Sequence, residues 1–371
     1  MNSPTAEEDY TVEGKEGPIP TVSVVLPTFR SSKTVKRAVD SIIAQTFTDW
    51  EMIVINDYGS DDGTAEIIRG CMKSDDRIRL IQLNKRYGLA ESLNLGIRLS
   101  RGRYVARMDS DDVSKPKRFE KQVRLLDGDE STGICGTWQK HVGSNEWLHR
   151  AAADDKVCRA RLLFWCDLCH STLMLRKEVF LSNGLFYDSN YKAEDYELWT
   201  RAMEFTRIRN IPEVLGIYSE GEGITNSKLD ELSAENGIIV ANTLRCIFGI
   251  ELDEQERSLF SQWNYTLEGD PDREKKLRSL EEILRRIWGR NQELKSFDDS
   301  ALIVAISNVW YKSRFNSNIG DRTFIDPKRI DDVFNEKHIS SKIIRYRVFR
   351  RRNSGIITRL KGLLGIMLGR Q

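Results

Sequence analysis

The sequence lacks any run of about 18 apolar residues, the length that a membrane-spanning helix needs, so no such helix is expected. Its first 20 residues are polar and acidic, with no apolar segment after a basic start, so we expect no secretory signal peptide. The 6 cysteines are scattered through the chain, which favours reduced thiols in a cytoplasmic protein. An excess of charge is lacking too, because 57 basic residues balance 56 acidic ones. Nothing at the level of the whole chain therefore indicates nucleic acid as a partner.

What is present is a composition typical of a soluble globular protein, with 40% hydrophobic and 30% charged residues, and 371 residues are enough for two domains. Apolar runs with β-branched residues alternate with helical periodicity from residue 22 onward. This order predicts an α/β fold with a mostly parallel, doubly wound sheet. Ligands bind such sheets outside the carboxyl ends of the strands. The strands are expected at 22–29, where Pro27 should stop the strand, and at 52–57, 77–83 and 103–109, with helices at about 34–44, 65–72 and 90–99.

The rest of the chain is divided by its composition. Residues 1–20 are expected to be a disordered tail, residues 21–225 the α/β domain and residues 226–338 a helical domain rich in Glu, Lys and Arg. Residues 341–371 hold nine Lys or Arg and no acid, interleaved with apolar residues. That pattern, within a tail at 339–371, is typical of a basic amphipathic helix on an anionic membrane surface. A helix packed on the protein and a disordered basic end remain equally open.

Three carboxylates follow the strand that ends near residue 109: Asp109, Asp111 and Asp112. Like charges at this spacing repel one another unless a cation or a donor-rich ligand lies among them. Carboxylate oxygens are preferred by Mg²⁺ and Mn²⁺, which take further ligands from substrate phosphates. The motif therefore predicts a divalent metal holding a diphosphate, although a solvated acidic turn explains most isolated Asp-x-Asp motifs.

Five segments in order carry a family resemblance: VSVVLPTFR, TFTDWEMIVINDYGSDDGT, NKRYGLAESLNLGIRLSRGRYVARMDSDD, CHSTLMLRKEVF and AEDYELWTRA. Together, over roughly residues 21–220, they resemble the family 2 glycosyltransferases, which have the GT-A fold. One departure is Tyr58, which interrupts the usual Asp-Gly-Ser turn.

The resemblance implies a nucleotide-sugar donor site in the first half of the domain. Asp57 would receive the edge of the base, and Arg86 and Gly88 would run along the donor. For Asp57 the alternative is a turn-forming residue, and for Arg86 a solvated loop cation. The loop that would hold the base and ribose consists of Pro27, Thr28 and Phe29.

The same resemblance assigns the acids. Asp111 would bind the metal, Asp109 would contact ribose or metal-bound water, and Asp112 would support them. Asp195 matches the general base, which takes the proton of the acceptor hydroxyl; Glu194 would raise its pKa or hold the acceptor. Attack opposite the leaving group would invert the anomeric configuration. The alternative for Asp195 is a helix N-cap.

His170 follows Cys166 and Cys169 in a pattern that also matches c-type haem attachment, and Cys158 adds a zinc alternative. The missing signal peptide argues against haem, and zinc lacks an obvious fourth ligand, with only Cys135 or His141 to consider. In the resemblance, His170 lies on the acceptor side of the site. The alternative interpretation is that His170 is only a half-buried histidine that precedes a strand.

These observations predict a metal-dependent, inverting glycosyltransferase that moves a sugar from a UDP-sugar to a glycan or lipid-linked acceptor. We expect it in the cytoplasm or peripherally on the cytoplasmic face of a membrane. A nucleotidyltransferase is a distant alternative, because LPTFRSS replaces the Gly-rich loop of that class. A catalytically silent sugar-nucleotide binder or membrane-associated interaction protein is the alternative from another class.

Overall fold

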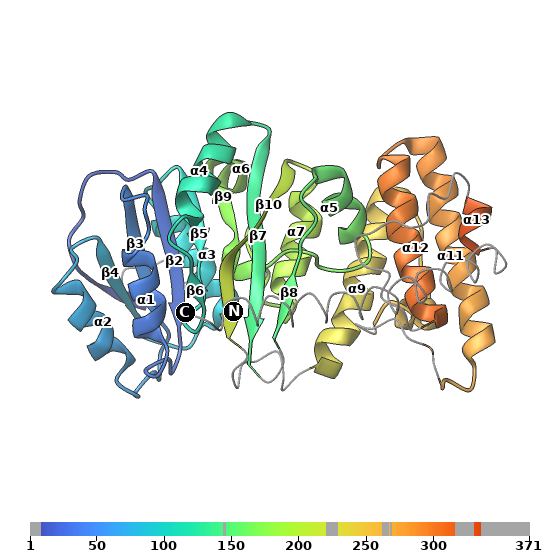
Figure 1. Cartoon of the computed structure of the whole chain (residues 1–371). Helices are drawn as coiled ribbons and strands as arrows, with labels where there is room; N and C mark the ends of the chain where they lie inside the picture. The colour runs from blue at the N-terminus through green and yellow to red at the C-terminus, as the bar shows by residue number, and fades with distance from the viewer. Residues whose placement is uncertain are drawn as a thin grey trace, which may run out of the picture. The chain divides into compact units, whose positions relative to one another are not determined.

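The structure is a computed structural model, and its helices and strands alternate as the sequence predicted (Figure 1). It describes residues 9–143, 146–219, 229–261, 267, 269–315 and 330–334. Within these ranges no helix combines the length and apolar character that crossing a membrane requires. The described residues form two compact units, one comprising the residues up to 261 with Ser296–Asp298, and the other the remaining residues.

The first unit is built on a mixed sheet whose strands β4, β3, β2 and β5 are mutually parallel. These four strands are completely or almost completely buried, as expected when helices cover both faces of a sheet. Helices α1, α2 and α4 pack on one face, where their apolar side chains join Leu26, Val54 and Ala106 in a single core. Helix α3 lies on the opposite face, where Gly96 approaches Val25. The elements are β2 (Val22–Thr28), α1 (Val35–Ile43), β3 (Trp50–Asn56), α2 (Thr64–Met72), β4 (Ile78–Leu83), α3 (Leu89–Leu99), β5 (Tyr104–Arg107) and α4 (Arg118–Gly128).

The second half of the sheet mixes directions. Strand β9 is antiparallel to both β5 and β7, whereas β10 runs parallel to β7. The long strand β10 was not predicted, and with β6 it extends the sheet beyond the parallel half. The elements are β6 (Val113–Ser114), β7 (Thr132–Val142), β8 (Trp147–His149), α5 (Asp155–Leu162), the short 3₁₀ helix η2 (His170–Thr172), β9 (Met174–Arg176), α6 (Lys177–Ser182), α7 (Glu194–Ala202) and β10 (Arg207–Ser219).

Two expectations about chain boundaries need correction. Pro27 does not stop its strand, because β2 continues to Thr28 and pairs with β3 to that residue. The pairing of β2 with β5 ends earlier, at Val25. Proline has no backbone N–H, but at position 27 no hydrogen bond to β5 is lost by its absence. The expected disordered tail is also ordered in part, since strand β1 (Tyr10–Glu13) pairs with the edge strand β4.

The unit also includes two helices that the sequence analysis assigned to the C-terminal domain, α9 (Leu229–Phe248) and α10 (Glu254–Ser258). Helix α9 packs on α7, and Glu235 accepts hydrogen bonds from the backbone N–H groups of Lys192 and Ala193. The compact unit therefore ends some residues beyond 225, because this helix covers the segment that leads into α7.

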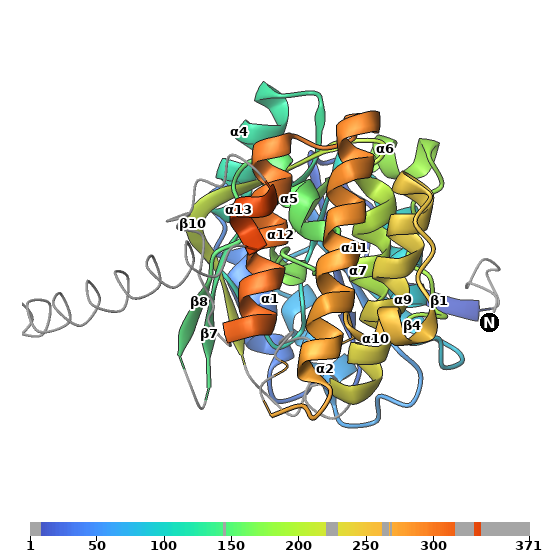
Figure 2. The same ribbon diagram turned by 90° about the vertical axis from the view of Figure 1, so that its right-hand side faces the viewer.

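The second unit is helical, as expected from its composition. Figure 2 shows α11 (Arg273–Leu294) beside α12 (Asp299–Phe315), and α13 (Ile330–Phe334) packs on both. Leu277, Leu280, Ile283, Leu284 and Ile287 form the buried stripe of α11. The expected basic tail at 339–371 lies outside the described residues.

Candidate active site

The acidic motif follows β5 directly, at the carboxyl end of the parallel strands, where the sequence analysis expected it. Asp112 is the buried member: it accepts hydrogen bonds from Ser171, from the Gln139 amide at 3.3 Å and from the Ser219 backbone N–H at 3.1 Å. Burial, then the charge of Asp109, raises the pKa of Asp112 to about 7. These contacts agree with a supporting role, because Asp112 joins η2, β7 and β10 to the motif.

Asp109 and Asp111 are half-buried. Burial and then the neighbouring Asp109 raise the pKa of Asp111. The Arg37 guanidinium donates to the backbone oxygen of Asp111 at 2.6 Å, but no side chain of the described residues donates to its carboxylate. Asp111 is therefore an acceptor-rich group beside a like charge, and positive charge brought to it would be stabilised.

Such a donor set fits a hard divalent cation. Two carboxylates that repel one another and retain free oxygen acceptors match the oxygen ligands that Mg²⁺ and Mn²⁺ prefer, with the remaining positions taken by water and phosphate. Among the described residues, however, no group of three or more His, Cys, Asp or Glu side chains is gathered closely enough to hold a metal by itself. The protein contribution would thus be Asp111 with Asp109.

Helix α7 brings the second pair of acids to the site. Its N-cap position is occupied by Ala193, so Asp195 is not the N-cap that formed its alternative reading. The carboxylate of Asp195 accepts the adjacent Tyr196 N–H at 2.7 Å, and burial raises its pKa. Burial, and next the charge of Asp195, raises the pKa of Glu194 to about 8. Both acids therefore hold protons more tightly than carboxyl groups in water.

A buried arginine that the sequence analysis overlooked lies among these acids. Arg107, the last residue of β5, is 4% exposed and forms an ion pair with Asp109. Burial opposes its charge, but Asp109 more than compensates and raises the pKa of Arg107. Its charge also acts on Glu194, Asp195 and His170. The sequence did contain a signal for this residue, because Arg107 is a charged residue inside the apolar run that precedes Asp109.

His170 lies beside Asp195, with 3.9 Å between its Nδ1 and the Asp195 Oδ2. Its Nε2 lies 2.9 Å from the Tyr187 hydroxyl. Burial, and then the charge of Arg107, lowers the pKa of His170 well below its usual value, so the ring is neutral. The side-chain amide of Asn94, in α3, holds the backbone of Tyr187 by two hydrogen bonds. It donates to the Tyr187 carbonyl oxygen and accepts from the Tyr187 N–H, both at 2.8 Å. The structure thus brings His170 to the predicted base and adds Tyr187 as its partner.

The expected donor loops meet around Asp57. Its carboxylate accepts the backbone N–H groups of Tyr58, Tyr87 and Gly88 at 2.9, 3.1 and 3.0 Å, and the Arg86 Nε at 2.9 Å. Asp57 therefore links the loop after β3 to the start of α3. Its role toward a base stays a prediction, because these four donors already use most of the acceptor capacity of a carboxylate.

Other donor-loop residues lie close by. The Arg86 guanidinium is 3.4 Å from the centroid of the Phe29 ring, and its side chain is half exposed. Thr28 faces β3 and donates to the Asn56 amide oxygen at 2.9 Å, next to Pro27 in the strand. Gly88 has φ 82° and ψ −177°, a conformation open essentially only to glycine.

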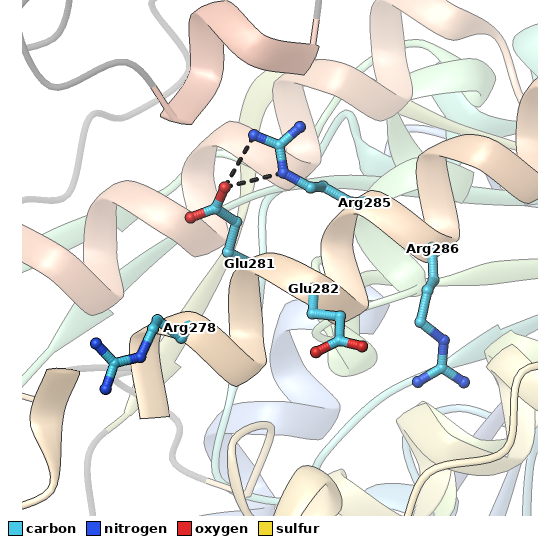
Figure 3. A pocket seen from close by; sticks show the side chains of 5 residues that line it. All are labelled: Arg278, Glu281, Glu282, Arg285 and Arg286. Carbon is cyan, nitrogen blue, oxygen red and sulfur yellow. Dashed lines mark hydrogen bonds and ion pairs between the residues drawn. The ribbon is translucent and has the colours of Figure 1, made fainter. Parts of the chain in front are cut away.

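The cysteine pattern lies partly at the site, because the Cys166 thiol donates to the Asp195 carboxylate at 4.0 Å. Cys158 donates to the Ala152 carbonyl oxygen at 2.9 Å, and all six cysteines are free thiols. Among the described residues, Cys158, Cys166, Cys169 and His170 do not belong to any group of three or more side chains that could hold a metal ion. A hollow elsewhere, on helix α11, is lined by five charged side chains, Arg278, Glu281, Glu282, Arg285 and Arg286 (Figure 3). Arg285 pairs there with Glu281 and Asp331, so this hollow is a solvated, internally paired helix face.

The mostly parallel sheet, with an acidic motif at the carboxyl ends of its strands, has the architecture of the GT-A fold. The family model described as glycosyl transferase family 2 matches residues 23–181. A putative glycosyltransferase, EpsE of Bacillus subtilis, is 30% identical over 231 residues, covering 61% of this chain and 82% of that protein. The chain belongs to glycosyltransferase family 2.

Other relatives carry more varied names. An uncharacterized glycosyltransferase of Haemophilus influenzae is 31% identical to this chain. The alignment covers 54% of this chain and 65% of that protein. The Escherichia coli UDP-Glc:alpha-D-GlcNAc-diphosphoundecaprenol beta-1,3-glucosyltransferase WfgD is 26% identical to this chain. The alignment covers 51% of this chain and 72% of WfgD.

Two solved structures share the fold. TarS 1–349 of S. aureus, in complex with UDP-GlcNAc, superposes with a TM-score of 0.55 at 16% identity, over 79% of this chain and 87% of that chain. The mannosyltransferase PcManGT of Pyrobaculum calidifontis, in complex with GDP-Man and Mn²⁺, has a TM-score of 0.51 at 16% identity, over 77% and 79%. These values confirm the predicted GT-A architecture.

Proposed function

We propose that this protein is a metal-dependent, inverting glycosyltransferase that moves a hexosyl residue from a UDP-sugar to a hydroxyl of a glycan or lipid-linked saccharide. The observation that carries the proposal is the meeting of two acidic pairs from distant parts of the chain. Asp109 and Asp111 lie after β5, Glu194 and Asp195 lie at the start of α7, and Asp109 acts electrostatically on both α7 acids.

The chemistry assigned to Asp195 is proton removal. The acceptor oxygen attacks the anomeric carbon on the face opposite the diphosphate while its proton passes to Asp195. The bond between that carbon and the diphosphate oxygen breaks, and the nucleoside diphosphate leaves with the electron pair. Burial raises the pKa of Asp195, which suits a base that works near neutral pH. The neutral His170 beside it can orient the carboxylate without neutralising it.

Asp111 and Asp109 would hold a divalent cation against the donor diphosphate. Such an ion acts as a Lewis acid that stabilises the charge of the departing diphosphate. The Arg107 side chain forms an ion pair with Asp109, and its positive charge limits the repulsion among the acids. Support for UDP over GDP comes from the names of relatives: the WfgD name specifies UDP-Glc, and TarS holds UDP-GlcNAc, whereas PcManGT holds GDP-Man.

The acceptor and the location of the protein are proposed from the name of one relative and from the composition of residues 341–371. The WfgD name specifies a lipid diphosphate acceptor, and the basic segment at 341–371 suits peripheral contact with an anionic membrane at its cytoplasmic face. A chain truncated after Ser340 should then bind vesicles with anionic lipid less well than the full chain. Equal binding of the two chains would remove the membrane part of the proposal.

The experiment that tests the donor site is a calorimetric titration of UDP and GDP, each with and without Mn²⁺. We expect UDP to bind the full chain only with Mn²⁺, and Asp111→Asn to abolish that binding. Release of UDP from UDP-glucose or UDP-GlcNAc then separates an enzyme from a silent binder. If neither nucleotide binds with or without metal, the proposed function is wrong.

A further inference from the structure

Four rings gather where β7, β8 and β10 lie side by side (Figure 1). The His141 ring of β7 stacks on Trp147 of β8, with centroids 3.8 Å apart and planes inclined by 24°. Tyr218 of β10 lies on the other side of His141, at 4.6 Å. His149 lies further along β8, 5.8 Å from Trp147. The proposed donor and catalytic sites use none of these four residues.

The strand register explains the arrangement. His141 pairs with Trp147 on one side and with Tyr218 on the other, so the three residues are direct neighbours across three strands. Cross-strand neighbours project from the same face of a sheet. The three rings, which we call the ring row, therefore form one stack, in which Trp147 and Tyr218 lie on the two sides of His141 and Trp147 is the exposed ring.

The ring row continues from the candidate active site. Gln139 precedes His141 by two residues, so it projects from the same face, about 7 Å along the strand. The Gln139 amide donates to Asp112 at 3.3 Å and to Ser171 at 2.7 Å. On β10, the N–H of Ser219, the residue after Tyr218, donates to Asp112 at 3.1 Å. A bound molecule could therefore lie on the ring row and reach the acidic motif.

The exposure of the ring row suits a neutral, partly apolar ligand. Trp147 is 47% exposed, although large aromatic side chains are usually covered. The nearest ion pair, between Lys140 and Glu146, lies at positions that alternate with His141 and Trp147, and its charges are paired with each other. An aromatic face carries partial negative charge and attracts the C–H groups of one face of a pyranose ring, so the face of Trp147 that His141 does not cover suits such a ring.

We propose that Trp147, held in place by His141 and Tyr218 behind it, forms a saccharide subsite, on which a pyranose ring of the acceptor stacks beside the catalytic carboxylates. This inference rests on the proposed function, because it places the acceptor of that reaction. It goes further in naming the side chain on which the carbohydrate ring of that acceptor stacks. A purely lipid or peptide hydroxyl would have no use for the ring row.

The test uses the full chain and three probes, the methyl β-pyranosides of glucose, galactose and N-acetylglucosamine, with glycerol as the polyol control. Trp147 offers a matched control in Leu148, which is similarly exposed at 41% but projects from the opposite face of β8. NMR would follow the indole N–H of Trp147, identified by its absence in Trp147→Phe. Saturation-transfer measurements would give the affinity of each variant for the probes.

We expect at least one pyranoside, and not glycerol, to shift the Trp147 indole resonance. Trp147→Ala should weaken pyranoside binding by about 3- to 10-fold, the range expected for loss of one stacked ring. Leu148→Ala should leave it unchanged, and Trp147→Phe should restore most of it. Because Trp147 is exposed, the variants should keep the unfolding temperature of the parent chain.

The inference is overturned if no pyranoside shifts the Trp147 resonance, or if Trp147→Ala and Leu148→Ala bind the probes equally. Titration of UDP with Mn²⁺ on the same samples separates this failure from failure of the proposed function. A chain that binds UDP but no pyranoside contradicts the subsite alone. A chain that binds a pyranoside at Trp147 but no nucleotide contradicts the donor site and leaves a carbohydrate-binding surface.

Discussion

Two carboxylate sites at the same edge of the sheet are built in opposite ways. Asp57 accepts three backbone N–H groups and the Arg86 side chain, so its charge is balanced within the protein. The acids Asp109, Asp111, Glu194 and Asp195 instead share one buried cation, Arg107. Burial and mutual repulsion raise the pKa of Asp111 and Glu194.

The difference indicates that the two sites have different roles, one structural and one in binding or catalysis. A carboxylate whose acceptors are filled fixes the conformation of two loops, and its removal should chiefly cost stability. A group of carboxylates with excess charge is destabilising unless a cation or a proton arrives, which is the usual condition of a binding or catalytic site. Substitutions at the two sites should therefore have opposite effects on stability and activity.

The largest effect is expected for Asp195→Asn. An amide cannot take the proton of the acceptor hydroxyl, so kcat should fall by about 10²- to 10⁴-fold. UDP binding in the presence of Mn²⁺ should be unchanged, because the donor does not need the base. Rates of UDP release from UDP-GlcNAc and UDP titrations would measure the two quantities.

Glu197→Gln is the matched control for that experiment. Glu197 also lies in the first turn of α7, but it pairs with Arg201 at 2.6 Å. Its substitution should leave kcat within about twofold while removing a partly exposed ion pair of small energetic value. Equal losses in the two variants would show that damage to α7, and not loss of a base, explains the result.

Removal of the shared cation should give the largest loss of stability. Arg107→Met leaves buried carboxylates without compensation, which typically costs about 3–5 kcal/mol. Denaturant unfolding would measure this loss. Asp109→Asn added to Arg107→Met should recover part of it, because one of the uncompensated charges is then gone. Additive losses in the double variant would contradict the shared-charge arrangement.

Arg107 also shows how far sequence reasoning reaches. The parallel strands and the positions of Asp57, Asp109 and Asp195 were predictable, because apolar periodicity and the order of motifs reflect local structure and the family resemblance. Which groups contact one another was not predictable. The Arg107–Asp109 ion pair and the filled acceptors of Asp57 depend on side-chain directions at the ends of strands.

Strand β10 was missed for a related reason. It carries three irregularities in its pairing with β7, and its sequence includes Pro212, so neither strict alternation nor an unbroken apolar run marks it. Its partner β7 supplies the burial that favours the strand. The contacts of Ser219 and Tyr218, which connect the acidic motif to the ring row, consequently had no signal in the sequence alone.

A smaller loss is expected at the internally balanced site. Asp57→Ala leaves three backbone N–H groups and Arg86 without their acceptor, at a cost of about 1–3 kcal/mol. Asp111→Asn, the matched change at the other site, should leave the free energy of unfolding unchanged or increase it, because it removes one of two repelling charges. Denaturant unfolding without metal would compare them. Equal destabilisation by the two variants would erase the distinction between the sites.

The last effect is a pH dependence at Glu194, which appears only above the ordinary pKa of a glutamate. Burial and Asp195 raise its pKa from 4.5 to about 8, so the folded state binds this proton more tightly than the unfolded state. Its contribution to stability is present below pH 4.5 and is lost as the pH rises toward 8. Glu194→Gln removes the titration, so the variant should be more stable than the parent at pH 8, by about 4 kcal/mol, and similar to it at low pH. Thermal unfolding of both proteins across this range would measure the difference, and a gap that does not grow with pH would mean that Glu194 is ionised in the folded protein throughout.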